Sequence, residues 1–215
     1  MKILAASKIL KANDALAAEN RQKLTEAKVI AVNWMGSPGS GKTTLLEALA
    51  RYWQGQRKLA VIQGDVAGSL DAQRMETLGL PVVQINTDGA CHLDANMVAQ
   101  ALAALPLEPG SLLMIENVGN LVCTAGFDLG EHLRLVVLSV PEGDDKLVKY
   151  PAIFRTIHGL VVSKRDLLPQ VDFHLERVQA DLQRLNPRAA LFFVSAVRQE
   201  GIAELAQWIQ GHQVG

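Results

Sequence analysis

One short segment constrains the fold of this chain more than any other. It reads Gly36-Ser37-Pro38-Gly39-Ser40-Gly41-Lys42-Thr43 and fits the pattern G-x-x-x-x-G-K-[ST]. An apolar run, residues 29–34, precedes it, and helix-forming residues 45–50 follow. In this context of strand, glycine turn and helix start, backbone N–H groups can converge on phosphate oxygens without steric hindrance from side chains. We therefore predict that the chain binds a nucleoside triphosphate, in preference to a chance match in a glycine-rich turn.

The end of this segment carries the side chains that phosphate chemistry needs. Lys42 is expected to neutralise phosphate charge, and the hydroxyl of Thr43 is expected to bind Mg²⁺. The predicted nucleotide-binding segment continues to Thr44. Both Lys42 and Thr43 are thus expected at the nucleotide site, and which nucleotide binds and for what purpose stays open at this point.

Strand-like and helix-like segments alternate from residue 29 onward, which predicts a doubly wound α/β fold. Several expected strands are continuous apolar runs, typical of strands buried on both faces of a parallel sheet. We predict a mostly parallel sheet of about seven strands in one domain, residues 29–215. An amphipathic helix is expected before it, within residues 1–28, where Ile9, Ala12, Leu16 and Glu19-Asn20 recur at roughly helical spacing. The expected strands are residues 29–34, 59–63, 82–85, 112–116, 135–140, 160–162 and 191–194, and expected helices include residues 94–105, 173–185 and 201–209.

Composition argues against several other classes of protein. The 215 residues are 49% hydrophobic, enough for a full core, and carry a net charge of −1. Because no basic face is evident, nucleic acid is not an expected partner. No apolar stretch is long enough to cross a bilayer, and lysines interrupt the apolar residues of the N-terminus, unlike in a signal peptide. We expect a cytoplasmic protein without membrane association.

Polar residues follow the expected strands, where ligands gather in an α/β sheet. Asp65 follows the second strand and could reach Mg²⁺ directly or through water. Glu116 ends the fourth strand, and Gly119 comes three residues later. That spacing suits a switch in which the carboxylate faces the metal and the glycine N–H faces the terminal phosphate. An ordinary turn at the end of a strand is the alternative.

The residues after the sixth strand, Ser163-Lys164-Arg165-Asp166, indicate a guanine site. The carboxylate of Asp166 can accept both N–H donors of the guanine edge, a pair that adenine lacks, and Lys164 can lie over the base. Ser163 stands where the usual guanine-reading pattern has asparagine. After the last strand, Ser195-Ala196 stands where a backbone N–H contacts the guanine oxygen. A solvated polar turn is the alternative interpretation.

The only two cysteines of the chain are Cys91 and Cys123. Cys91 is followed by His92 in a glycine-containing loop, and thiolate and imidazole are ligands that Zn²⁺ and Ni²⁺ favour. Two chains meeting face to face could each supply Cys91, His92 and Cys123 to a shared site. From the residues alone, a buried cysteine and an unrelated histidine are the simpler interpretation.

Four strings of residues together resemble the HypB family, GTPases of the SIMIBI P-loop class that help deliver nickel to precursors of [NiFe]-hydrogenases. The similarity runs from about residue 29 to the C-terminus. The strings are the phosphate loop, Gln84-Ile85-Asn86-Thr87 leading into Cys91-His92-Leu93-Asp94-Ala95, the segment Glu116-Asn117-Val118-Gly119-Asn120-Leu121-Val122-Cys123, and Phe127-Asp128-Leu129-Gly130-Glu131.

This resemblance reverses the interpretation of the cysteines. It implies that Cys91, His92 and Cys123 bind Ni²⁺ or Zn²⁺ at the interface of a homodimer promoted by GTP. It further implies catalytic and Mg²⁺ roles for the phosphate-loop lysine and threonine and the two carboxylates named above, and a guanine site at Lys164 and Asp166. The implied partners are a HypA-type nickel chaperone and the hydrogenase large-subunit precursor, with slow intrinsic GTP hydrolysis.

The chain departs from the family pattern at a few positions. Ser163 replaces the asparagine of the guanine motif, Thr124 replaces the proline that usually follows the switch cysteine, and Gly68 stands where a hydroxyl residue is common. Two alternative functions stay open. One is a UreG-like urease accessory GTPase, although the UreG metal loop reads Cys-Pro-His and has no counterpart of Cys123. The other is a P-loop ATPase or kinase with incidental cysteines.

Overall fold

The molecule is built around one seven-stranded sheet in which every neighbouring pair of strands is parallel. The computed structural model describes residues 6–66, 68 and 70–212, except the side chains of residues 6–9. The strand order is β3-β2-β4-β1-β5-β6-β7. The strands are β1 (Ile30–Gly36), β2 (Leu59–Asp65), β3 (Val82–Asn86), β4 (Leu112–Glu116), β5 (Leu133–Ser139), β6 (Gly159–Ser163) and β7 (Ala190–Phe193). The predicted fold class and all seven predicted strands are confirmed, with bounds that differ by at most two residues at either end.

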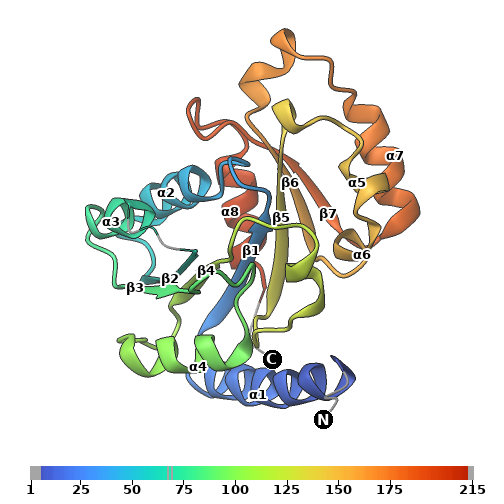
Figure 1. Ribbon diagram of the computed structural model, residues 1–215. Helices are drawn as coiled ribbons and strands as arrows, with labels where there is room; N and C mark the ends of the chain where they lie inside the picture. Colours follow the sequence, from blue (N-terminus) through green and yellow to red (C-terminus); the bar gives the residue numbers. More distant parts are fainter. Residues whose placement is uncertain (1–5, 67, 69, 213–215) are drawn as a thin grey trace.

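Helices cover both faces of the sheet (Figure 1). They are α1 (Ala6–Glu26), α2 (Lys42–Trp53), α3 (Leu70–Glu76), α4 (Ala95–Ala104), α5 (Lys146–Lys149), α6 (Pro151–Phe154), α7 (Leu175–Leu185) and α8 (Ile202–Gln210), with 3-10 turns η1 (Cys123–Gly126), η2 (Val140–Glu142) and η3 (Arg165–Gln170). The predicted helices correspond to α1, α4, α7 and α8, and the helix expected after the glycine-rich segment is α2. The short helices α3, α5 and α6 were not predicted, because segments of seven or four residues show too little periodicity.

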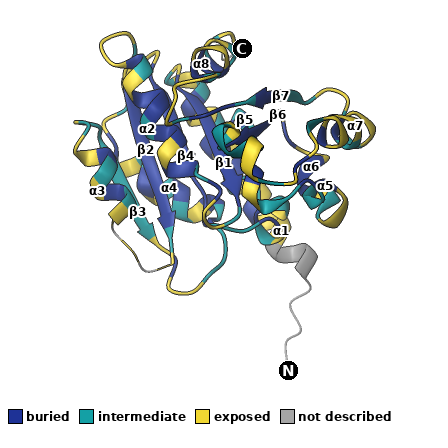
Figure 2. Ribbon diagram, turned by 90° about the horizontal axis from the view of Figure 1, so that it is seen from above, coloured by how far each residue is buried: buried dark blue, intermediate teal, exposed yellow. Residues whose placement is uncertain are grey.

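Alternate residues of each central strand enter different hydrophobic cores. On β1, Val32 and Trp34 pack with α2 and α8, whereas Ala31 packs with α1 and α4. A further core joins Val136 and Leu138 of β5 to α5, α6 and α7. The strands in the middle of the sheet are therefore buried throughout (Figure 2), which explains their continuous apolar sequences.

The strand order reverses on either side of β1, and such a reversal opens a crevice at the carboxyl ends of the strands. Glu116, the last residue of β4, lies opposite Trp34 of β1 and Gln63 of β2. The register therefore brings the ends of β1, β2 and β4 to the same edge. The residues that the sequence analysis singled out after these strands gather there.

The predicted N-terminal helix is confirmed within the described residues, but its buried face differs from the expected one. Residues 1–5 of the predicted segment lie outside the described part. Ala12 is exposed and Leu16 is half-buried, while the buried stripe is Asn13, Ala17, Asn20 and Leu24. Apolar spacing alone does not reveal this stripe, because two of its members, Asn13 and Asn20, are polar. The boundary predicted at residue 28 stays a prediction.

Across the residues that the structure describes, no helix combines the length and apolar character needed to span a bilayer.

Candidate functional site

The glycine-rich segment forms the turn between β1 and α2. Gly36 has φ of +154°, and a Cβ atom there would lie 2.4 Å from the carbonyl oxygen of Val137. Gly41 has φ of +90° and immediately precedes the helix. The ammonium group of Lys42 donates hydrogen bonds to the carbonyls of Gly36 and Ser37, at 3.3 and 3.2 Å. The turn therefore needs its glycines, and its lysine lies over the loop where phosphates are predicted to bind.

Thr43 and Glu116 meet at the foot of this loop. The Thr43 hydroxyl donates a 2.8 Å hydrogen bond to Oε1 of Glu116, whose other oxygen, Oε2, is buried without a partner in the described part of the chain. Burial raises the pKa of Glu116, while the charge of Lys42 and the bond from Thr43 oppose the rise. Burial likewise lowers the pKa of Lys42, opposed mainly by Glu116. An unpartnered carboxylate oxygen beside a hydroxyl fits a hard cation such as Mg²⁺.

Asp65 and Gly119 complete a cleft of about 460 Å³ that Lys42, Thr43 and Glu116 also line. The Asp65 carboxylate accepts hydrogen bonds from the backbone N–H groups of Val66 and Gly68, at 2.7 and 2.9 Å. A Cβ at Gly119 would lie 2.9 Å from the backbone nitrogen of Pro38. The segment after β4 therefore touches the phosphate loop, and only a glycine permits that approach.

Arg74 of α3 also lines this cleft, although no sequence pattern singled it out. Its guanidinium forms a bidentate pair with Glu47, at 2.9 and 2.8 Å, and contacts Asp71 at 3.1 Å. The sequence feature that comes closest to indicating it is the pair of opposite charges at Asp71 and Arg74, three residues apart, a spacing typical of ion pairs on one helix. Because α3 itself was not predicted, nothing in the sequence placed this arginine beside the phosphate loop.

A second cavity, of about 330 Å³, adjoins the first at Gly41, Thr44 and Lys164. Asp166 and Ala196 line it, and Ser195 donates a 2.6 Å hydrogen bond to the Asp166 carboxylate. Lys164 has φ of +57° and donates to the carbonyl of Gly39 at 2.7 Å. The residues predicted for the base therefore lie together, next to the predicted phosphate site.

Ser163, the departure from the usual guanine motif, is buried at the end of β6. Its hydroxyl donates a 2.6 Å hydrogen bond to the carbonyl of Ser40 in the phosphate loop. Ser163 therefore stabilises the loop, while the carboxylate of Asp166 is the acidic group that faces the second cavity.

Cys91, His92 and Cys123 lie together, although the first two belong to the loop after β3 and Cys123 begins η1, beyond α4 and β4. Their ligand atoms lie within 4.8 Å of one another, and all three residues are half-buried. The ring of His92 stacks on Phe127 with centroids 3.8 Å apart. A hydrogen bond with Cys91 and burial raise the pKa of the Cys123 thiol, and burial lowers that of His92. Two thiols and an imidazole in one cluster suit Zn²⁺ or Ni²⁺.

A chain of buried asparagines connects the two candidate sites. Asn117, which follows Glu116, accepts a 3.1 Å hydrogen bond from the backbone of Leu93, the residue after His92. The Asn117 amide donates to Asn33 at 3.3 Å, and Asn33 donates to Glu131 at 3.1 Å. The end of β4 is therefore hydrogen-bonded to the loop that carries Cys91 and His92.

Comparison with known proteins agrees with this architecture. Residues 29–193 match the family described as CobW/HypB/UreG, nucleotide-binding domain. The chain is 47% identical to the hydrogenase maturation factor HypB of Rhizobium leguminosarum bv. viciae, over 94% of this chain and 68% of that protein. It is 44% identical to a probable HypB of Methanocaldococcus jannaschii, over 95% of this chain and 93% of that one.

The crystal structure of HypB from Helicobacter pylori in complex with nickel superposes with a TM-score of 0.88 at 39% identity, covering 92% of this chain and 93% of that one. The predicted resemblance is therefore confirmed by sequence and by structure. The chain belongs to the HypB family of hydrogenase maturation factors, within the CobW/HypB/UreG group of nucleotide-binding domains.

Proposed function

We propose that this chain is a GTP-hydrolysing metallochaperone that binds nickel and delivers it during [NiFe]-hydrogenase maturation. The observation that most supports this proposal is the hydrogen bond from the Leu93 backbone to Asn117. This bond joins the predicted phosphate sensor at Glu116 to the loop that carries Cys91 and His92. Family membership and the nickel bound by the Helicobacter pylori relative support the choice of metal. An unrelated kinase activity receives no comparable support from these relatives. A role in urease maturation is the second candidate function, because the Helicobacter hepaticus relative, 44% identical over 95% of this chain, is a hydrogenase/urease maturation factor HypB.

In this proposal, Lys42 neutralises phosphate charge and Asp166 selects guanine. Thr43, Asp65 and Glu116 are the residues that would hold Mg²⁺, which supplies charge neutralisation at the transferred phosphate. Gly119 contacts the terminal phosphate through its N–H group. Hydrolysis is slow because Arg74, the arginine that lines the predicted phosphate cleft, is paired with Glu47 and Asp71.

Nucleotide state would control the metal site through the segment after β4. Gly119 touches Pro38, and Asn120 forms a bridge with Gly36, so a terminal phosphate would shift this segment together with Cys123. Coupling of roughly 1–3 kcal/mol would change metal affinity by about 5- to 150-fold, enough for capture and release. We further propose a homodimer promoted by GTP, a HypA-type nickel chaperone and the hydrogenase large-subunit precursor as partners.

A titration with Ni²⁺ in the presence of GDP or a non-hydrolysable GTP analogue tests this function, with molecular mass measured in parallel. We expect at least a fivefold difference in Ni²⁺ affinity between the two nucleotides and a larger mass with the analogue. Equal affinity and equal mass in both states would contradict the coupling. A chain that binds ATP and GTP equally well would contradict the guanine assignment.

Asp166→Asn should weaken GTP binding and improve binding of xanthosine triphosphate. The variant loses a charged acceptor for two guanine N–H groups, worth about 1.5–3 kcal/mol or roughly 10- to 150-fold in affinity. Its new amide N–H can instead donate to the xanthine oxygen. Calorimetric titration of both nucleotides measures the change. Asp172→Asn, at a side chain that is 93% exposed, is the matched control and should alter neither affinity.

Metal affinity should fall as the pH is lowered from 8 to 6. Because the pKa of Cys123 is raised, this thiol is protonated before the metal binds and must lose its proton on binding. Each thiol proton displaced lowers affinity by up to about tenfold per pH unit. The lowered pKa of His92 keeps the imidazole neutral, so it adds no proton competition at the upper end of this range. Competition with a chelator at each pH measures the slope, and a flat profile would argue against thiolate ligands.

A further inference from the structure

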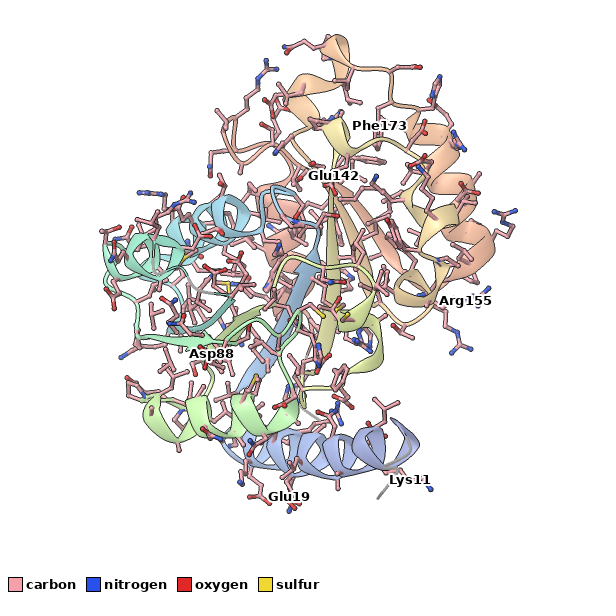
Figure 3. All side chains as sticks on the ribbon, viewed as in Figure 1. Lys11, Glu19, Asp88, Glu142, Arg155 and Phe173 are labelled. Carbon is pink, nitrogen blue, oxygen red and sulfur yellow. The ribbon has the colours of Figure 1, made fainter. Side chains whose placement is uncertain are left out.

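The buried face of α1 carries amides where a packed helix normally carries apolar side chains. Asn13 is 6% exposed and Asn20 is 1% exposed, beside the fully buried Ala17. The charged residues Lys11 and Glu19 point away from the domain on the outer side of the helix (Figure 3). Burying an amide is unfavourable unless its donors and acceptors are satisfied. The partners of Asn13 and Asn20 therefore indicate what this face of α1 binds.

Both asparagines bridge the same two segments of the chain. Asn13 donates to the carbonyl of Asp128 at 2.8 Å and accepts from the N–H of Ala95 at 2.9 Å. Asn20 donates to the carbonyls of Ala95 and Leu129, at 2.8 and 3.1 Å. The start of α4 and the segment 128–129 are thus fastened to one another through α1, which lies alongside α4 in Figure 1.

Two more contacts hold the second of these segments against α1. Nη2 of Arg21 donates to both carboxylate oxygens of Asp128, at 2.6 and 2.8 Å, and Nε donates to the carbonyl of Glu131 at 3.2 Å. A Cβ at Gly130, whose φ is +92°, would lie 2.6 Å from the Ala17 carbonyl oxygen. Only a glycine permits the backbone to approach the helix this closely.

The two segments that α1 joins are those that carry the candidate metal ligands. Ala95 lies three residues beyond His92, and Asp128 lies five residues beyond Cys123. Phe127, next to Asp128, stacks on the His92 ring. A change in the separation of these segments would therefore move Cys123 and Phe127 relative to Cys91 and His92.

We propose that α1 is a positioning element of the metal site, in which Asn13 and Asn20 fix the spacing of the loop bearing Cys91 and His92 from the turn bearing Cys123. The inference rests on the proposed metal-binding role of these three residues. Metal–sulfur and metal–nitrogen bonds require ligand atoms at closely defined distances, and a pre-arranged cluster loses less entropy on binding. Residues that support metal ligands typically change affinity by about 10- to 100-fold when replaced.

The test is Asn20→Ala in the full chain, with Ni²⁺ affinity measured by chelator competition and the nickel–thiolate absorption band recorded. We expect Ni²⁺ affinity to fall by about 10- to 100-fold and the band to shift or weaken. GDP affinity should be unchanged, because Asn20 contacts no part of the nucleotide cleft. Arg21→Gln is a milder second variant, at a side chain that is 38% exposed, and should weaken Ni²⁺ binding in the same direction.

Asn186→Ala is the matched control for the loss of a structural asparagine. Its amide donates to the carbonyls of Phe154 and Ile157, at 3.1 and 2.8 Å, so it also makes two side-chain bonds to backbone carbonyls, but it holds the turn after α6 to the end of α7. The control should lower the melting temperature and leave the Ni²⁺ affinity and absorption band unchanged. If Asn20→Ala affects metal binding no more than Asn186→Ala, α1 is only a packing helix and the proposal is wrong. If Cys91→Ala leaves Ni²⁺ binding intact, the metal site itself is wrong, which is a separate failure.

Discussion

Replacing Lys42 with alanine should abolish nucleotide binding at micromolar concentrations. The ammonium group is buried and lies over the turn that is predicted to hold the phosphates. Removing one partner of a buried charge pair costs about 2–5 kcal/mol, or roughly 30- to 4,000-fold in affinity. Calorimetric titration with GDP and GTP measures the loss. Ni²⁺ affinity without nucleotide should be unchanged, because Lys42 lies outside the Cys91, His92 and Cys123 cluster.

Lys58→Ala provides the matched control for this prediction. The ammonium group of Lys58 pairs with Glu108 at 2.8 Å, and the Lys58 side chain is 71% exposed. Lys58 directly precedes β2, so it lies at the amino ends of the strands, whereas the phosphate loop lies at their carboxyl ends. This variant should bind both nucleotides as the unaltered chain does. Undiminished GTP affinity in Lys42→Ala would refute the assignment of the glycine-rich turn as the phosphate site.

Replacing Cys91 or Cys123 with alanine should remove high-affinity binding of Ni²⁺ and Zn²⁺. Each variant takes one of three ligand atoms from a cluster that spans less than 4.8 Å. Since replacement of supporting residues already costs about 10- to 100-fold in metal affinity, loss of a ligand should exceed a hundredfold. Chelator competition measures the affinity, and GDP binding should be retained.

His174→Gln controls for metal held by surface histidines. The His174 side chain is 63% exposed and pairs with Asp144 at 2.9 Å, in a part of the chain distant in sequence from the cluster. Its replacement should leave metal affinity unchanged. An unaltered metal stoichiometry in both cysteine variants would show that the cluster is not the metal site.

Local sequence patterns were sufficient to predict the sheet and the phosphate loop. The strands next to β1 are buried on both faces, so their apolar runs identify them without long-range information. Asp65, Glu116 and Asp166 were identified because each lies at or just after the end of a strand, and parallel strands end at one edge. Arg74 was missed because it lies on a seven-residue helix, too short for periodicity to reveal.

The amino-acid pattern placed a helix before the domain but did not identify its buried face. That face is defined by Asn13 and Asn20, whose burial is possible only because Ala95, Asp128 and Leu129 supply hydrogen-bond partners from more than 70 residues away. Scales of helix propensity and hydropathy predict that an asparagine is exposed, whether or not the fold buries it. The role of α1 is therefore visible only in the folded chain.

The sequence by itself determined the fold class and the phosphate loop, because strand burial and a glycine turn depend on residues close together in the chain. It also determined which thiols and imidazole were available, and only the family resemblance, not the spacing of these residues, implied that they act together. Only the tertiary structure decided that Cys91, His92 and Cys123 form one cluster, because their proximity depends on how two loops pack against each other and on the helix α1. The same packing joins that cluster to Glu116 through Asn117, a contact that no sequence spacing specifies.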